Sequence, residues 1–155
     1  MPRYRTLACA LLFALSFAIT AHAAPSAPGL SVQERQIAAA AEAGKDDAIA
    51  LLERLVNQNS GSLNLPGVAA AGEMVRAELE PLGFDVQWID MRATGRAGHL
   101  LATHKGNGRG KRILLIGHLD TVFEPDSPFQ RFVRNGESAT GPGIADDKGG
   151  VVIIV

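Results

Sequence analysis

Beyond residue 30, the first half of the chain has apolar residues at helical spacing. Ser31 and Glu34 stand three positions apart, as in a capping box, and predict a helix over residues 31–43. Two more helices are predicted over residues 46–57 and 67–80, the second ending beside a proline. Both carry an apolar stripe, formed by Ala48, Leu51, Leu52, Leu55 and Val56 and by Val68, Ala71, Val75 and Leu79, respectively. Each of these two helices is therefore expected to bury one face.

Three later segments have strand patterns. Residues 84–88 alternate apolar and polar side chains, which predicts a strand with one buried face, and a second strand is predicted over residues 98–104. The run Ile-Leu-Leu-Ile at 113–116 is apolar on both faces, as in a central parallel strand covered by helices on either side. The order of the elements predicts a layered α/β fold with at least one buried parallel strand.

The composition is that of an ordinary globular protein. The chain has 155 residues, enough for one domain or part of one, and its 46% hydrophobic and 20% charged residues exclude wholesale disorder. The net charge of −1 provides no basic excess to neutralise phosphates, so no nucleic-acid partner is expected. A single cysteine excludes both an internal disulfide and a Cys-rich zinc module.

The N-terminus has the pattern of a secretory signal peptide. In residues 1–23, two arginines precede an apolar run over residues 7–20, and Ala-His-Ala follows as a cleavage site. The run is shorter than the roughly 20 residues that a spanning helix needs, which makes a retained membrane anchor the weaker alternative. Cleavage after Ala23 predicts a secreted or periplasmic protein without membrane association. Residues 24–30 are predicted to be a flexible linker, and residues 31–155 the folded part.

Candidate chemistry first appears at the end of the predicted central strand. His118 and Asp120 stand two residues apart, so in extended chain they point to the same side, at the sheet edge where α/β folds bind ligands. A metal-ligating histidine needs its other ring nitrogen held, commonly by a carboxylate such as Asp120. Taken alone, however, His-x-Asp is common, and the pair is more typical of a structural hydrogen bond than of a metal site.

The second candidate is the glycine-rich segment 141–150, Gly-Pro-Gly-Ile-Ala-Asp-Asp-Lys-Gly-Gly. It differs from a dinucleotide fingerprint because Asp146 stands where the third glycine belongs and would repel a pyrophosphate. The glycines would instead allow a close backbone approach and present Asp146 in a fixed direction. The alternative is a solvated turn whose carboxylates favour the start of the next helix, an interpretation that Asp147 and Lys148 fit well.

Together, Gly-His-x-Asp-Thr-Val and the glycine-rich segment resemble the M20 family of zinc peptidases, in particular its glutamate carboxypeptidase group. The resemblance implies a three-layer α/β/α catalytic domain with two Zn²⁺ ions per complete active site, for which Co²⁺ could substitute. His118 would ligate one zinc, Asp146 would bridge both, and Asp120 would act in catalysis by orienting His118. It further implies a peptide or N-acyl amino acid as substrate, from which a C-terminal amino acid such as glutamate is released, and a parent enzyme that can dimerise.

The chain departs from the family pattern in one respect. It contains no Glu-Glu pair, which in the family supplies the general base and a metal ligand, and the later acidic and histidine ligands are also missing. Because it ends in the apolar run 151–155, it is interpreted as an N-terminal fragment that is inactive by itself. An aminoacylase or deacylase of the same family, and a non-catalytic truncated product, are the alternatives.

Overall fold

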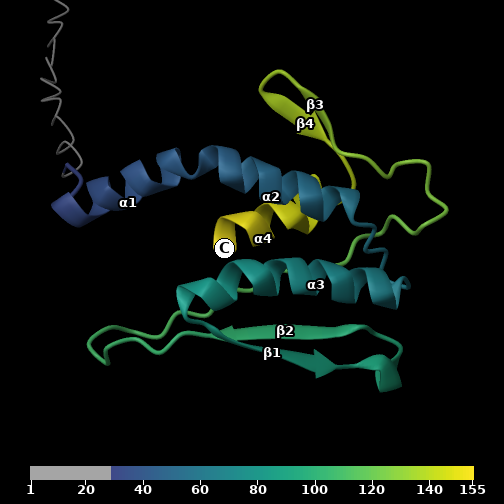
Figure 1. Cartoon of the computed structure of the whole chain (residues 1–155), viewed down its shortest axis with the longest axis horizontal. Helices are drawn as coiled ribbons and strands as arrows, with labels where there is room; N and C mark the ends of the chain where they lie inside the picture. The colour runs from purple at the N-terminus through teal and green to yellow at the C-terminus, as the bar shows by residue number, and fades with distance from the viewer. Residues whose placement is uncertain (1–28) are drawn as a thin grey trace, which may run out of the picture.

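The computed structural model describes residues 29–155. The predicted signal peptide, residues 1–23, and most of the predicted linker, residues 24–30, lie outside this part. In chain order the elements are α1 (Val32–Ala43), α2 (Lys45–Asn57), α3 (Leu65–Leu79), β1 (Asp85–Asp90), β2 (Gly98–Thr103), β3 (Val133–Asn135), β4 (Ser138–Thr140) and α4 (Gly149–Ile154), as Figure 1 shows. The three predicted helices and the first two predicted strands are confirmed within a few residues.

Local capping sets the helix boundaries. The Ser31 hydroxyl accepts a hydrogen bond from the Glu34 amide at 3.2 Å, and the Glu34 carboxylate accepts one from the Ser31 amide at 2.6 Å, which is the predicted capping box. Hydrogen bonding of the Glu34 carboxylate to the Ser31 backbone and, next, to the Ser31 side chain lowers the pKa of Glu34, because it favours the ionised form. At the start of α3, the Asn64 side chain accepts a hydrogen bond from the Gly67 amide at 3.1 Å.

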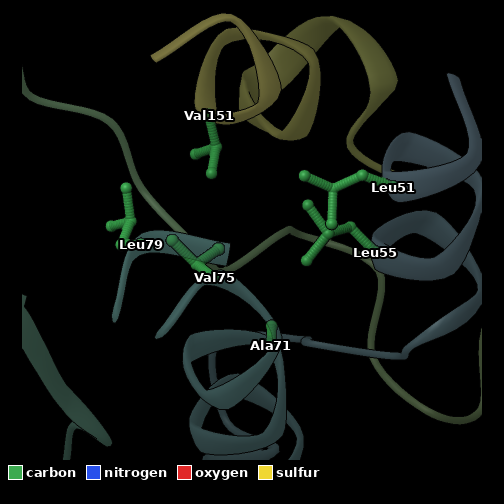
Figure 2. Close-up of a cluster of buried hydrophobic side chains, with 6 residues drawn as sticks. All are labelled: Leu51, Leu55, Ala71, Val75, Leu79 and Val151. Atoms are coloured by element: carbon green, nitrogen blue, oxygen red, sulfur yellow. The ribbon is translucent and has the colours of Figure 1, made fainter. Parts of the chain in front are cut away.

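The hydrophobic core lies between α2, α3 and α4. Figure 2 shows the cluster of buried side chains, which are Leu51, Leu55, Ala71, Val75, Leu79 and Val151. The apolar stripes predicted for the second and third helices supply all of these residues except Val151, which comes from α4. Full burial of a Leu or Val side chain stabilises the fold by roughly 1.5–3 kcal/mol, so this cluster holds the three helices together. By contrast, α1 buries no side chain.

Strands β1 and β2 form an antiparallel hairpin that covers α3. Their register pairs Trp88 with Leu100, and Val86 and Trp88 of β1 are half-buried between exposed neighbours, as the alternating pattern over residues 84–88 predicted. Trp88 lies against α3 where Gly72 leaves room: a Cβ there would stand 2.7 Å from Cζ3 of the indole. The small residue on α3 therefore allows the sheet to pack closely on the helix.

The prediction of a buried central strand at 113–116 is wrong for this structure. The segment pairs with no strand among residues 29–155, and Ile113 and Ile116 are about 80% exposed. A strand that is apolar on both faces needs hydrogen-bonded neighbours at its edges and helices on both faces. Among residues 29–155, β1 pairs only with β2 and β3 only with β4, so no strand flanks this segment, and its side chains stay exposed.

The mixed α/β class is confirmed, but the three-layer arrangement is not formed by the residues that the structure describes. These residues form two antiparallel pairs, β1 with β2 and β3 with β4, and their one parallel contact is the isolated bridge between Gly61 and Thr121. The β3–β4 hairpin was not predicted, although the Asn135-Gly136 pair at its turn is typical of one. Within residues 29–155, no helix is both long and apolar enough to span a bilayer.

Candidate metal centre

The segment that carries His118 and Asp120 is held in place at its end by the loop after α2. The Thr121 amide donates a hydrogen bond to the Ser60 carbonyl at 2.9 Å, and the Ser62 amide donates one to the Thr121 carbonyl at 3.0 Å. Thr121 itself is buried. These backbone bonds bring residues from two distant parts of the sequence together beside the predicted site.

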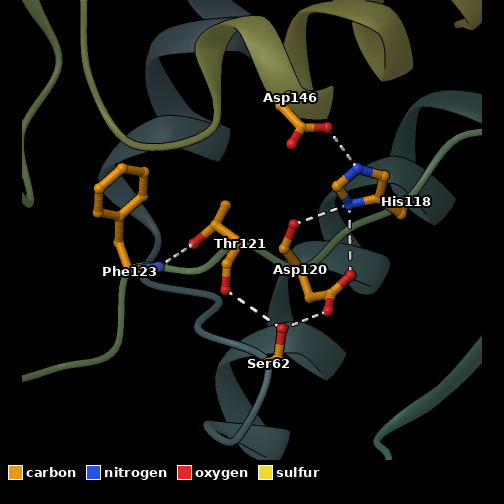
Figure 3. Close-up of polar contacts among 6 residues, drawn as sticks. All are labelled: Ser62, His118, Asp120, Thr121, Phe123 and Asp146. Carbon is orange, nitrogen blue, oxygen red and sulfur yellow. Dashed lines mark hydrogen bonds and ion pairs between the residues drawn. The ribbon is translucent and has the colours of Figure 1, made fainter.

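The structure brings the three predicted site residues together around the His118 ring (Figure 3). Nε2 of His118 lies 2.9 Å from Oδ1 of Asp146. On the other side of the ring, Nδ1 lies 2.9 Å from the Asp120 carbonyl oxygen and 3.3 Å from Asp120 Oδ1. One ring nitrogen therefore faces Asp146 and the other faces Asp120.

The charges around His118 favour its protonated form. Burial of the ring lowers its pKa, but the hydrogen bonds to Asp146 and to the Asp120 backbone, together with the two negative carboxylates, outweigh burial and leave the pKa raised. An imidazolium can donate one N–H toward each aspartate. The same site therefore has a net attraction for positive charge.

Asp146 reaches the site through a tight turn. Gly143 has φ +78°, a left-handed conformation that glycine adopts without strain, and a Cβ on it would lie 2.6 Å from the Thr121 methyl group. The chain then makes one helical turn over residues 144–148, in which Asp146 departs from helical geometry with φ −151° and ψ 89°. The Asp146 carboxylate is 85% exposed and points toward His118.

The neighbouring Asp147 points elsewhere. Its carboxylate lies so close to Gly117 and Gly150 that a Cβ at either position would stand 2.8 Å or less from a carboxylate oxygen. The peptide bond between Asp146 and Asp147 is cis. The two adjacent carboxylates thus occupy different surroundings, one open toward His118 and the other packed against backbone.

The interpretation of Lys148 as part of a solvated turn is wrong. Its side chain is 2% exposed, and its ammonium group donates hydrogen bonds to the carbonyls of Leu55 at 2.6 Å and Gln58 at 2.9 Å. These carbonyls stand at the C-terminal end of α2, where a cation also interacts favourably with the helix dipole. Burial lowers the pKa of Lys148 to about 8. Lys148 therefore anchors the Asp146 turn to α2.

Ser62 is a polar residue of the site that the sequence analysis did not identify. Its hydroxyl donates a hydrogen bond to Oδ2 of Asp120 at 2.5 Å and lies 3.3 Å from the Thr121 carbonyl. Because 58 residues separate Ser62 from Asp120, no local pattern relates the two. The one available signal was the position of Ser62 directly after the polar run at the end of α2.

These residues border an open pocket of about 380 Å³. Its polar side is formed by Ser62, His118, Asp120 and Asp146, while Val122, Phe123, Phe129 and Ile144 provide an apolar wall. The rings of Phe123 and Phe129 pack edge to face with their centres 5.1 Å apart. The pocket therefore combines charged groups with an apolar contact surface, as small-molecule sites usually do.

The donor atoms fit a zinc ion in type. An imidazole nitrogen and a carboxylate oxygen converge, and both are ligands that Zn²⁺ accepts. The Asp120 carboxylate lies beside the other ring nitrogen, Nδ1, which is where a metal-bound histidine commonly contacts a carboxylate. Residues 29–155 contain no group of three His, Cys, Asp or Glu side chains that could hold a metal ion, so they provide two of the ligands that a catalytic zinc needs.

Comparison with known proteins supports the resemblance to the glutamate carboxypeptidases. The chain is 40% identical over 111 residues to carboxypeptidase G2 of Pseudomonas sp. (strain RS-16). The aligned part covers 69% of this chain and 26% of that protein, so the chain spans about a quarter of the length of the curated relative it matches. No family model matches the chain. The identity supports a relationship to peptidase-type hydrolases.

Proposed function

We propose that this chain belongs to an exported zinc metallopeptidase of the M20 family, of the glutamate carboxypeptidase type, with a three-layer α/β/α catalytic domain. In this proposal His118 and Asp146 are zinc ligands, and Asp120 orients His118. The observation that carries it is the convergence of His118 Nε2 and Asp146 Oδ1 at 2.9 Å while Asp120 faces the other ring nitrogen. The 40% identity to carboxypeptidase G2 supports the same assignment.

Each of the three residues has a distinct task in this proposal. The Asp120 backbone carbonyl accepts the Nδ1 proton of His118 at 2.9 Å, and the Asp120 carboxylate lies 3.3 Å from the same nitrogen; together they fix the tautomer and leave Nε2 free to bind a cation. Asp146 supplies negative charge opposite Nε2, and its exposed carboxylate has two oxygens available for two ions. When bound, a zinc pair supplies Lewis-acid activation of the scissile carbonyl. The proposed substrate is a peptide or N-acyl amino acid, from which the enzyme releases a C-terminal glutamate.

The experiment compares two neighbouring carboxylates in the full-length protein. Asp146→Asn and Asp147→Asn each remove one negative charge and keep the shape of the side chain, but only Asp146 faces His118. We expect the wild-type protein to bind zinc and hydrolyse an N-acyl glutamate. Asp146→Asn should lose most of both properties, and Asp147→Asn should keep most of its bound zinc.

Elemental analysis gives the zinc content, and a parallel assay with N-acyl alanine measures the preference for glutamate. Equal zinc content in the wild type and Asp146→Asn would contradict the ligand assignment. Efficient hydrolysis of N-acyl alanine, but not of N-acyl glutamate, would overturn the proposed substrate while leaving the metal site in place. Faster loss of zinc from Asp147→Asn than from Asp146→Asn would indicate that Asp147, and not Asp146, is the zinc ligand.

The export part of the proposal rests on the signal-peptide pattern of residues 1–23. We expect the mature protein to begin at Ala24 and to be found in the periplasm or the medium. N-terminal sequencing of the protein from fractionated cells tests this. Intact Met1 on protein recovered from the cytoplasmic fraction would refute it.

A further inference from the structure

A line of two hydrogen bonds and one ion-pair contact connects the loop after α2 to the candidate metal ligands. It begins at the Ser62 hydroxyl, which lies 2.5 Å from Asp120 Oδ2, and continues from Asp120 Oδ1 to His118 Nδ1 over 3.3 Å. It ends at His118 Nε2, which faces Asp146 Oδ1 at 2.9 Å. Figure 3 shows that Ser62 and Asp146 lie at opposite ends of this line. The hydrogen bonds of the Ser62 hydroxyl go to Asp120 and Thr121, and not to His118 or Asp146.

The position of the Ser62 hydroxyl is set by its backbone. The Ser62 amide is bonded to the Thr121 carbonyl, one residue beyond Asp120. On the following residues of the loop, the Leu63 amide donates to the Glu124 carboxylate at 3.0 Å, and the Asn64 amide donates to the Gly61 carbonyl at 2.8 Å. Because the Ser60 carbonyl also accepts a hydrogen bond from the Thr121 amide, the loop is bonded on both sides of Ser62 to the residues that follow Asp120, and this holds the Ser62 hydroxyl facing Asp120.

Asp120 needs such support because it is not enclosed by the fold. Its side chain is 40% exposed, so packing alone leaves its carboxylate free to turn. The hydroxyl of Ser62 occupies one oxygen and leaves the other toward His118. A hydrogen bond to an ionised carboxylate is roughly twice as strong as one between neutral groups, so one serine is enough to bias the orientation.

On this geometry, and resting on the proposed function, we propose that Ser62 is a positioning residue of the zinc site. It acts through Asp120, which it holds in the orientation that directs His118 toward the metal. It touches neither metal nor substrate in this role. The consequence is that removal of the Ser62 hydroxyl weakens zinc binding only as long as Asp120 is present.

The test measures zinc dissociation constants in the full-length protein, by competition with a chromophoric chelator. Loss of a carboxylate or similar partner behind a metal ligand typically weakens metal binding about 10–100-fold. Ser62 contacts Asp120 and not the metal ligand His118 itself, so it is one contact further from the metal. We therefore expect Ser62→Ala to weaken zinc binding about tenfold, at the lower end of that range. Ser62→Thr keeps the hydroxyl and should therefore bind zinc clearly more tightly than Ser62→Ala, close to wild type.

The chain offers a matched control in Ser60, in the same loop. The Ser60 hydroxyl is buried and has no hydrogen-bond partner, so Ser60→Ala removes a hydroxyl from the same loop without touching Asp120. Zinc binding should be unchanged in this variant. Urea unfolding of each variant identifies any loss of folded protein, and dissociation constants are compared among variants that are folded.

A second pair of variants tests whether Ser62 acts through Asp120. In an Asp120→Ala background, the further change Ser62→Ala should have no additional effect on the zinc dissociation constant. As an independent measurement, ¹⁵N NMR of the His118 imidazole should show a smaller share of the Nδ1–H form in Ser62→Ala than in wild type or Ser62→Thr.

The outcomes separate this inference from the proposed function. A wild-type protein that does not bind zinc overturns both. If the wild type binds zinc and Ser62→Ala binds it equally well, the positioning role is wrong and the proposed metal site stands. An equal loss of affinity from Ser62→Ala with and without Asp120 also overturns the positioning role, because Ser62 then acts by another route.

Discussion

Replacement of Gly143 by alanine should destabilise the protein strongly, because two separate costs meet at this position. Gly143 has φ +78°, and a residue with a Cβ loses roughly 1–2 kcal/mol in the left-handed conformation. In addition, the new Cβ would lie 2.6 Å from the methyl group of buried Thr121 and 3.2 Å from Lys148 Cδ. Overpacking of this kind costs roughly 1–3 kcal/mol. We therefore expect Gly143→Ala to lower the free energy of unfolding by about 3 kcal/mol.

Gly136 separates the two costs. It has φ +61° in the β3–β4 turn, but a Cβ there would meet no atom within 4 Å. Gly136→Ala should therefore show the backbone cost alone, about 1 kcal/mol. The assay is equilibrium unfolding in urea of the zinc-free protein, monitored by circular dichroism, with both variants compared with wild type.

The contact with Thr121 can be tested directly by a double variant. Thr121→Ser removes the methyl group that the new Cβ would strike and keeps the hydroxyl. Alone, it should cost about 1 kcal/mol for the lost buried methyl. Combined with Gly143→Ala, it should relieve the clash, so that the two losses are less than additive. The reasoning is refuted if Gly143→Ala and Gly136→Ala are equally destabilising, or if the double variant is fully additive.

Three further predictions concern the core and two charged groups. Leu55→Ala should cost about 2–5 kcal/mol in urea unfolding, because Leu55 is 1% exposed in the core; a loss below 1 kcal/mol would contradict that placement. Burial lowers the pKa of Lys148 from 10.5 to about 8, so between these pH values the unfolded state binds more protons than the folded state. The free energy of unfolding of the wild type should therefore rise from pH 8 to 10.5, and that of Lys148→Met should not. Hydrogen bonds from the Arg92 side chain and backbone lower the pKa of Asp90 from 3.8 to about 2, so the stabilising effect of Asp90 should be complete above pH 3.8 and lost as the pH falls through 2. In Arg92→Gln the guanidinium is lost and the backbone bond remains, so NMR should find a pKa for Asp90 above that of wild type and still below 3.8; an unchanged pKa would contradict the role of the Arg92 side chain.

The sequence alone was sufficient wherever a structure depends on neighbours a few residues apart. The capping box at Ser31 and Glu34 was readable because both partners lie within one helical turn. The stripes that placed Leu55 and Val75 in the core follow from helical periodicity. The spacing of His118 and Asp146, together with their motifs, was enough to select the candidate site, and the structure brings these two residues to 2.9 Å.

Only the tertiary structure decided contacts between segments far apart in the chain. The apolar run 113–116 indicated that burial would be favourable, but a strand's partners come from elsewhere in the chain, and residues 29–155 do not supply them. Lys148 carries a charge that usually lies in solvent, yet the end of α2 offers it two carbonyls 93 and 90 residues away. Ser62 reaches Asp120 because backbone bonds align two loops. Hydrophobic and polar patterns predict whether a side chain favours burial or solvent. Which residue it then contacts depends on how distant segments of the chain pack together.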